Sequence, residues 1–196
     1  MQRNATRTAS PALPDPQSTR QRILDIALGL FARLGYAGTS VADIAGELGT
    51  SKAALYYHFK SKVEILDALL AEPTERYAQL ADRAAGGGLT GEQLLDELID
   101  SIAGSRVLMG VVANDPSVIR VVMERATCPN PQEKLDAIIA VLAGPDPDPV
   151  ARIRAHAAFA VTKDTTLSQM SAGNGLLSAA DRAEILAAAN RALAGA

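Results

Sequence analysis

The stretch of residues 39–62, TSVADIAGELGTSKAALYYHFKSK, constrains the fold of this chain more than any other. Apolar residues recur at helical spacing over 41–48, Gly49 interrupts them, and a second short helical pattern opens after Ser51. Glycine suits the residue just past a helix end, and serine suits the N-cap of the next helix. The spacing therefore predicts two short helices joined by a turn of about three residues, the geometry of a helix-turn-helix unit.

The second of these helices is predicted to have an apolar and a polar face. Two large apolar residues four positions apart face the core. The outward face carries small residues, an aromatic pair and cations: Lys52, Ala53, Tyr56, Tyr57, His58 and Lys60. Such a face suits a helix that enters the major groove of DNA, with Lys52 and Tyr56 near the bases. Tyr57 and His58 are then candidates for phosphate contact. A surface hairpin with solvated lysines is the alternative interpretation.

The residues around this turn add to the interpretation. The run from Arg22 to Leu70 contains an amphipathic first helix, then G-Y-x-x-T-S, a G-x-S-K turn, an L-Y-Y-H-F helix and a K-S-K at the start of a fourth helix. In each of these elements it closely resembles the DNA-binding domain of the TetR family of bacterial transcriptional regulators. The resemblance covers about a quarter of the chain. It implies a two-domain helical regulator that binds double-stranded DNA.

The resemblance also implies roles for residues that flank the two helices. We expect Thr39 to cap the second helix. The resemblance implies that the hydroxyl of Thr39 or of Ser40 contacts a phosphate. Lys62 would anchor a phosphate at the start of the fourth helix, and an exposed lysine without a role is the alternative. Ala54 departs from the family, because many relatives carry a threonine or serine there. One phosphate contact is therefore expected to be missing, and Ala53 beside it leaves few side chains for base readout.

The charge of the chain is unevenly distributed. The whole chain carries 19 basic and 22 acidic residues, whereas residues 1–62 alone carry eight basic and four acidic residues. A basic N-terminal part on an acidic remainder favours polyanion binding at one end. Aromatic residues make up only 4% of the chain, and no stretch alternates with period two. We therefore expect an all-α fold.

The chain is predicted to divide into three parts. Residues 1–18 contain three prolines and few apolar residues, which predicts a disordered tail. An arm in which Arg3 and Arg7 reach DNA is the alternative. Residues 19–65 are expected to form the helix-turn-helix domain, with a first helix that Gly35 ends. Residues 66–196 are expected to form a helical effector-binding and dimerisation domain.

Helices beyond the first domain are expected to connect its parts. The fourth helix has an apolar face and is predicted to link the two domains, with a kink or a restart at Pro73. The last two helices, about 150–171 and 178–194, combine small residues with apolar spacings of three and four. In the resembled family these helices form a four-helix bundle with a second subunit, which implies a homodimer. An intramolecular partner is the alternative.

The resemblance further implies a small-molecule effector that binds inside the second domain and controls binding to a palindromic operator. The candidate lining residues are Leu98, Ile102, Arg106, Met109, Asn114, Met123, His156, Phe159 and Lys163. A stripe of methionine and aliphatic residues is also typical of plain core. Lys163 and Asp164 follow an apolar run, so one of them is expected to face packed surface.

Neither catalysis nor metal binding is indicated. His58 and His156 form no metal-ligand pair, and the motifs of nucleotide-binding enzymes and hydrolases are missing. Neither an apolar run of about eighteen residues nor a signal segment occurs. We therefore expect no cofactor, no metal and no membrane partner, and a cytoplasmic location. The sequence predicts a homodimeric repressor that an effector releases from DNA. The alternative is a helical protein-interaction module without sequence-specific DNA binding.

Overall fold

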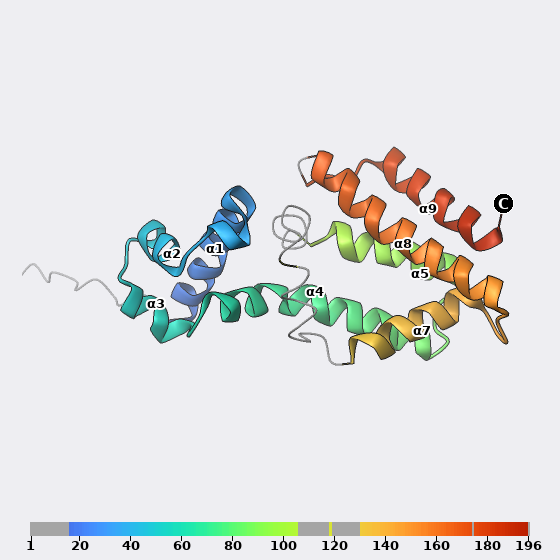
Figure 1. Cartoon of the computed structure of the whole chain (residues 1–196), viewed down its shortest axis with the longest axis horizontal. Helices are drawn as coiled ribbons and strands as arrows, with labels where there is room; N and C mark the ends of the chain where they lie inside the picture. Colours follow the sequence, from blue (N-terminus) through green and yellow to red (C-terminus); the bar gives the residue numbers. More distant parts are fainter. Residues whose placement is uncertain (1–15, 106–117, 119–129, 174, 196) are drawn as a thin grey trace, which may run out of the picture.

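The computed structural model describes residues 16–105, 118, 130–173 and 175–195. All regular structure in these residues is helical, which confirms the predicted all-α fold (Figure 1). The helices are α1 (Pro16–Gly38), α2 (Val41–Leu48), α3 (Lys52–His58), α4 (Lys62–Ala85), α5 (Gly91–Ala103), α7 (Pro131–Ala143), α8 (Pro149–Ala172) and α9 (Ala179–Ala194). None of these helices is long and apolar enough to cross a membrane.

The chain forms two packed parts that α4 joins (Figure 1). We call the first the head; it comprises α1, α2, α3 and the first part of α4. Its buried hydrophobic residues are Ile23, Leu24, Ala27, Leu30, Phe31, Tyr36, Ile44, Ala45, Leu55, Phe59, Ile65, Leu66, Leu69 and Leu70, with Val118 packed among them. This core extends past the predicted domain boundary at residue 65, because the apolar face of α4 continues it to Leu70.

The helices of the head end and begin where the local chemistry favours it. Gly35 breaks α1 with φ 74° and ψ 160°, a conformation that a residue with a Cβ rarely adopts. Gly49 ends α2 in the left-handed region, at φ 72°. The Ser51 hydroxyl caps α3 by accepting a hydrogen bond from the Ala54 amide. These three features confirm the predicted helix-turn-helix geometry.

The cap of α2 differs from the prediction. Ser40, and not Thr39, is the N-cap residue, and its hydroxyl accepts a hydrogen bond from the Asp43 amide. The Thr39 side chain is buried, and its hydroxyl donates to the Gly35 carbonyl at 2.8 Å. The break at Gly35 leaves this carbonyl available, so the threonine hydroxyl turns back to it instead of forward to the helix.

The other part of the chain, which we call the body, packs α5, α7, α8 and α9 around the second part of α4. Its buried core comprises Leu80, Ala81, Ala84, Leu94, Leu95, Leu98, Ile102, Ile138, Ile139, Leu142, Ala155, Ala158 and Ala189. The helix α4 runs without a restart through Pro73, whose side chain is buried. One uninterrupted helix therefore contributes to both cores.

Ion pairs attach the body helices to one another. Arg83 on α4 holds the Glu97 carboxylate on α5 with two hydrogen bonds of 2.5 and 2.8 Å. Arg182 on α9 contacts Asp96 at 2.7 Å and Asp100 at 2.9 Å, both on α5. The hydrogen bonds that Arg182 donates to Asp96, followed by those to Asp100, raise the pKa of Arg182 above its ordinary range. This guanidinium therefore stays charged and fixes α9 on α5.

We predict that Leu66→Ala lowers the free energy of unfolding by about 2–5 kcal/mol, because it leaves a cavity in the core of the head. Leu34→Ala is the matched control: the Leu34 side chain is 54% exposed, and we expect a change within about 0.5 kcal/mol. Chemical denaturation followed by circular dichroism measures both. Equal losses in the two variants would contradict the assigned core.

Candidate nucleic-acid interface

The outward face of α3 is open to solvent. Tyr57 is 83% exposed and Tyr56 47% exposed, while Leu55 and Phe59 on the opposite face are fully buried. Of the other residues of the outward face, Lys52, Ala53 and Lys60 are exposed and His58 is half-buried. Ala54, where the sequence departs from the resembled family, is exposed as well. The structure thus brings together on one surface the α3 residues that the sequence singled out. Their contacts with DNA remain a prediction.

The N-terminus of α2 presents the exposed Ser40 and a closed capping box. The Ser40 amide donates to the Asp43 carboxylate at 2.7 Å, and the Ser40 hydroxyl accepts from the Asp43 amide at 3.2 Å. The Ser40 side chain, then the Ser40 amide and, to a smaller extent, the charge of Lys52 hold the pKa of Asp43 below its ordinary value. Asp43 therefore stays ionised beside the first turns of α2 and α3.

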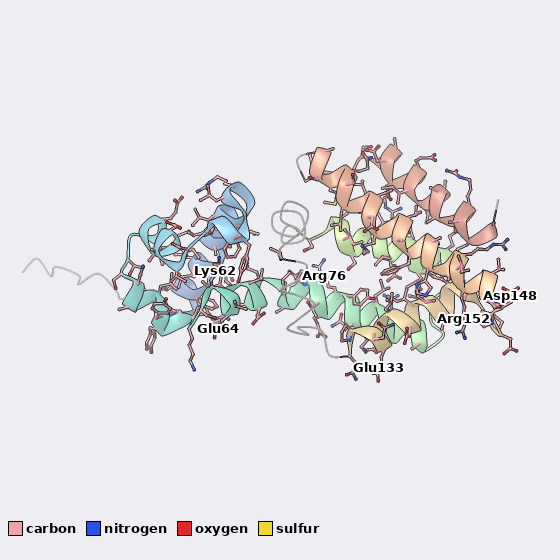
Figure 2. The ribbon with its side chains drawn as sticks, viewed as in Figure 1. Lys62, Glu64, Arg76, Glu133, Asp148 and Arg152 are labelled. Atoms are coloured by element: carbon pink, nitrogen blue, oxygen red, sulfur yellow. The ribbon has the colours of Figure 1, made fainter. Side chains whose placement is uncertain are left out.

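Lys62 lies at the head end of α4 (Figure 2). Its ammonium donates to the Tyr36 carbonyl at 2.6 Å and to the Thr39 carbonyl at 2.8 Å. It also lies 4.2 Å from the centroid of the Tyr36 ring, a cation–π distance. We expected an ammonium directed at phosphate, and the structure engages it within the protein. The Thr39 hydroxyl, another predicted phosphate donor, is likewise bonded inside the head.

Arg20 is a candidate interface residue that the sequence did not single out. It is exposed, and its guanidinium carbon lies 4.6 Å from the centroid of the Phe59 ring, at the residue that caps the end of α3. An arginine at the start of an amphipathic helix is too common to be recognised from the sequence alone. Its place beside α3 becomes evident only once α1 and α3 are packed.

The predicted effector residues are distributed over different surroundings. Leu98, Ile102 and the half-buried Phe159 pack in the core of the body. His156 is exposed on α8, and Lys163 forms an ion pair with Asp164, the more exposed of the two. The other four predicted residues, Arg106, Met109, Asn114 and Met123, lie outside the described residues.

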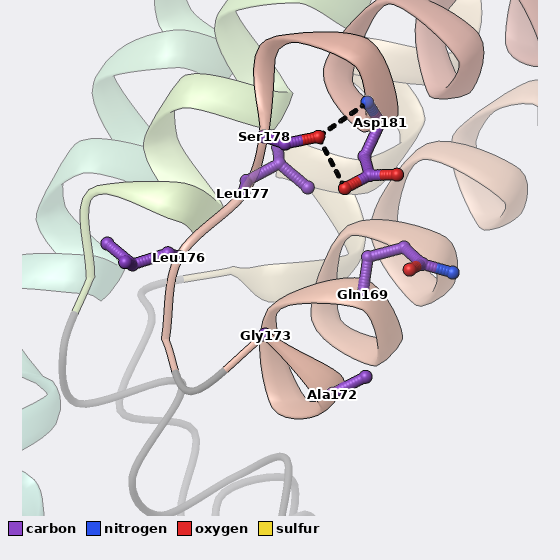
Figure 3. Close-up of a pocket in the computed structure, with 7 residues that line it drawn as sticks. All are labelled: Gln169, Ala172, Gly173, Leu176, Leu177, Ser178 and Asp181. Carbon is purple, nitrogen blue, oxygen red and sulfur yellow. Dashed lines mark hydrogen bonds between the residues drawn. The ribbon is translucent and has the colours of Figure 1, made fainter.

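A pocket of about 590 Å³ lies elsewhere, at the connection between α8 and α9 (Figure 3). Its lining residues are Gln169, Ala172, Gly173, Leu176, Leu177, Ser178 and Asp181. The Ser178 hydroxyl donates to the Asp181 carboxylate at 2.6 Å and accepts from the Asp181 amide at 3.0 Å. The pocket contains none of the predicted effector residues, and these two polar side chains satisfy each other.

We predict that the Asp43 carboxylate stabilises the head in a pH-dependent way. Because the folded pKa is lowered, its contribution is complete above about pH 4 and is lost as the pH falls through the folded pKa. The measurement is the free energy of unfolding of the chain and of Asp43→Asn between pH 7 and pH 2.5. We expect the difference between them to shrink as the pH falls below 4. A difference that stays constant with pH would show that the charge of Asp43 does not contribute to the stability of the head.

Comparison with known families matches residues 23–69 to bacterial regulatory proteins of the tetR family. The chain is 42% identical over 55 residues to the HTH-type transcriptional regulator AcrR of Shigella flexneri, covering 28% of this chain and 26% of that protein. It is 32% identical over 108 residues to the HTH-type transcriptional repressor Rv1474c of Mycobacterium tuberculosis, covering 55% of this chain and 58% of that protein. The chain thus spans less than two thirds of these curated relatives.

The likeness to solved structures extends over nearly the whole chain. The crystal structure of Mycobacterium smegmatis AmtR is 27% identical with a TM-score of 0.63, over 94% of this chain and 89% of that chain. A TetR-like regulator from Rhodococcus sp. RHA1 is 22% identical with a TM-score of 0.66, over 94% of this chain and all of that one, which shows the same fold. Residues 23–69 of this chain, which fold as a helix-turn-helix unit, therefore match the family of bacterial regulatory proteins named for tetR.

Proposed function

We propose that this chain is a DNA-binding regulator of transcription that reads a palindromic operator as a homodimer. The exposed outward face of α3, on a domain that matches the tetR family over residues 23–69, carries this proposal. The curated relatives are named as transcriptional regulators and not as enzymes, which supports a binding function. One of them is named a repressor, and we propose the same direction of regulation here.

The proposed reading mode places α3 in the major groove. Lys52 and Tyr56 reach the base edges from the exposed face of α3, with Ala53 close to the groove floor. Tyr57 and His58 contact phosphates from the same helix. Two heads in successive major grooves would lie roughly 34–36 Å apart, one helical turn of DNA. Because alanines occupy 53 and 54, shape and deformability of the operator supply part of the specificity.

Ser40 and Arg20 extend this surface beyond α3. The exposed Ser40 hydroxyl lies at the N-terminus of α2, where the amides and the helix dipole favour a phosphate. Arg20 brings a guanidinium beside Phe59 at the other end of α3. Phosphate contacts on both sides of a recognition helix fix its register on the duplex.

The proposed dimer forms through α8 and α9, which run side by side along one edge of the body (Figure 1). Two large apolar side chains on α8 are exposed in the single chain: Ile153 at 67% and Val150 at 51%. Ala157, one turn after Ile153, is also exposed and permits close approach of a second helix. Burial of these residues against a second copy would remove apolar surface from water.

A small-molecule effector is proposed to bind in the body. The Thr166 hydroxyl on α8 is buried and has no hydrogen-bond partner among the described residues, so a polar group of a ligand there would offset a desolvation cost. Leu98, Ile102 and Phe159 are proposed as apolar neighbours of the site. An effector that favours a different position of α4 would change the spacing of the heads and release the operator.

We predict that the purified full chain enriches one palindrome from a random duplex pool, and that light scattering gives the mass of two chains. Both results follow if two copies of α3 read equivalent half-sites. Tyr56→Ala is the matched variant for base reading and is expected to enrich a broader set of sequences. No enrichment above non-specific binding would contradict the proposal, and the chain would then be better described as a helical interaction module.

We predict that Ile153→Glu gives the mass of one chain in light scattering, because it places a charge where we propose an apolar interface. Leu34→Glu is the control, since Leu34 is a comparably exposed leucine in the head. It should leave the mass of the assembly unchanged. A dimeric Ile153→Glu protein at low micromolar concentration would show that the subunits meet elsewhere.

A further inference from the structure

Hydrogen bonds on both sides of Lys62 hold the start of α4. The Ser61 hydroxyl accepts a hydrogen bond from the Glu64 amide at 3.1 Å and caps the helix. The Glu64 carboxylate accepts one from the Lys60 amide at 2.6 Å. These two hydrogen bonds tie the backbone on either side of Lys62 to Glu64.

From this position the Lys62 side chain reaches Tyr36 and Thr39, which lie 26 and 23 residues earlier in the chain. The two carbonyls it contacts are that of Tyr36, in α1 after the break at Gly35, and that of Thr39, in the connection between α1 and α2. The α1 helix has no basic residue in its own last turn. Carbonyls at the end of a helix carry partial negative charge and favour a cation, and the Lys62 ammonium meets this preference at the Tyr36 carbonyl.

The connection that Lys62 holds is the one that positions α2. The Thr39 amide donates to the Tyr36 carbonyl at 3.3 Å, and the Thr39 hydroxyl donates to the Gly35 carbonyl at 2.8 Å. The Tyr36 ring packs edge-on against Phe31 with a centroid separation of 5.2 Å. Ser40, the cap of α2, follows Thr39 directly. The orientation of α2 therefore depends on where these two carbonyls are held.

We propose that Lys62 is a positioning residue, which fixes the α1–α2 connection on α4 and so sets the orientation of the DNA-reading unit on the linking helix. This inference rests on the proposed function for its DNA readout. It differs from a phosphate anchor, because two of the three N–H donors of the ammonium are used by the Tyr36 and Thr39 carbonyls. Removal of the ammonium would leave these carbonyls without a charged donor in a part-buried site.

Hydrogen exchange of the DNA-free full chain tests the positioning role directly. Lys62→Met keeps an unbranched side chain and removes the charge and its donors. We expect the amides of α2 to exchange about tenfold faster in this variant, while those of residues 23–31 in α1 keep their rates. Lys60→Met, which removes a neighbouring exposed charge, is the control and should leave the exchange of α2 unchanged. Should Lys62→Met not fold, Lys62→Gln, which keeps a neutral donor, replaces it.

Salt dependence of binding to the selected duplex separates the two roles of Lys62. A positioning residue predicts that Lys62→Met lowers affinity about tenfold or more while the slope of log K against log salt is retained. A phosphate anchor predicts a slope shallower by about 0.9. Unchanged exchange in α2, equal acceleration throughout the head, or loss of slope would each overturn the proposal. If no duplex is selected at all, the proposed function fails, whereas the exchange result still decides the role of Lys62.

Discussion

The helix α4 is buried in two hydrophobic cores at once, and the arrangement of the whole chain depends on this. Its first part packs Ile65, Leu66, Leu69 and Leu70 into the head, and its second part packs Leu80, Ala81 and Ala84 into the body. At 24 residues it is about 36 Å long. A stiff element of that length cannot change its position in one core without changing its relation to the other.

Polar contacts near the two ends of α4 orient this helix against its neighbours. In the body, Arg83 pairs with Glu97 and Asp82 pairs with Lys134, which orients α4 against α5 and α7. Three of these four side chains are at least 36% exposed, so water screens the attraction within each pair. In the head, Lys62 contacts two carbonyls and a ring in a half-buried site, where screening by water is weaker. In the body two ion pairs attach α4 to its neighbours, whereas the polar contacts described in the head depend on the Lys62 side chain alone.

Local signals allowed much of the fold to be predicted from the sequence. Gly49 and Ser51 act within their own turn, and the four-residue spacing of Leu55 and Phe59 fixes which face of α3 is buried, so these predictions are confirmed. The cap of α2 was misplaced by one residue, because Thr39 and Ser40 are both good capping residues and only the break at Gly35 distinguishes them. Pro73 does not restart the helix: it lies buried within one continuous α4.

The candidate site was harder to predict than the helices, because its contacts join distant parts of the chain. The partners of Lys62 lie 23 and 26 residues away, and no local pattern identifies them. Arg20 reaches Phe59 only after α1 and α3 pack together. In the body, the sequence could not show that His156 faces outward while Phe159, three residues later, packs on the core. Both lie on an alanine-rich helix with little difference between its faces.

A structure of the full chain bound to its selected duplex tests the central claim most directly. It would show where the Lys62 ammonium lies when the head is docked on DNA. Our account predicts that α3 occupies the major groove, with Tyr56 toward the base edges, and that the ammonium stays within hydrogen-bond distance of the Tyr36 and Thr39 carbonyls. An ammonium that has left both carbonyls for a phosphate oxygen would contradict it.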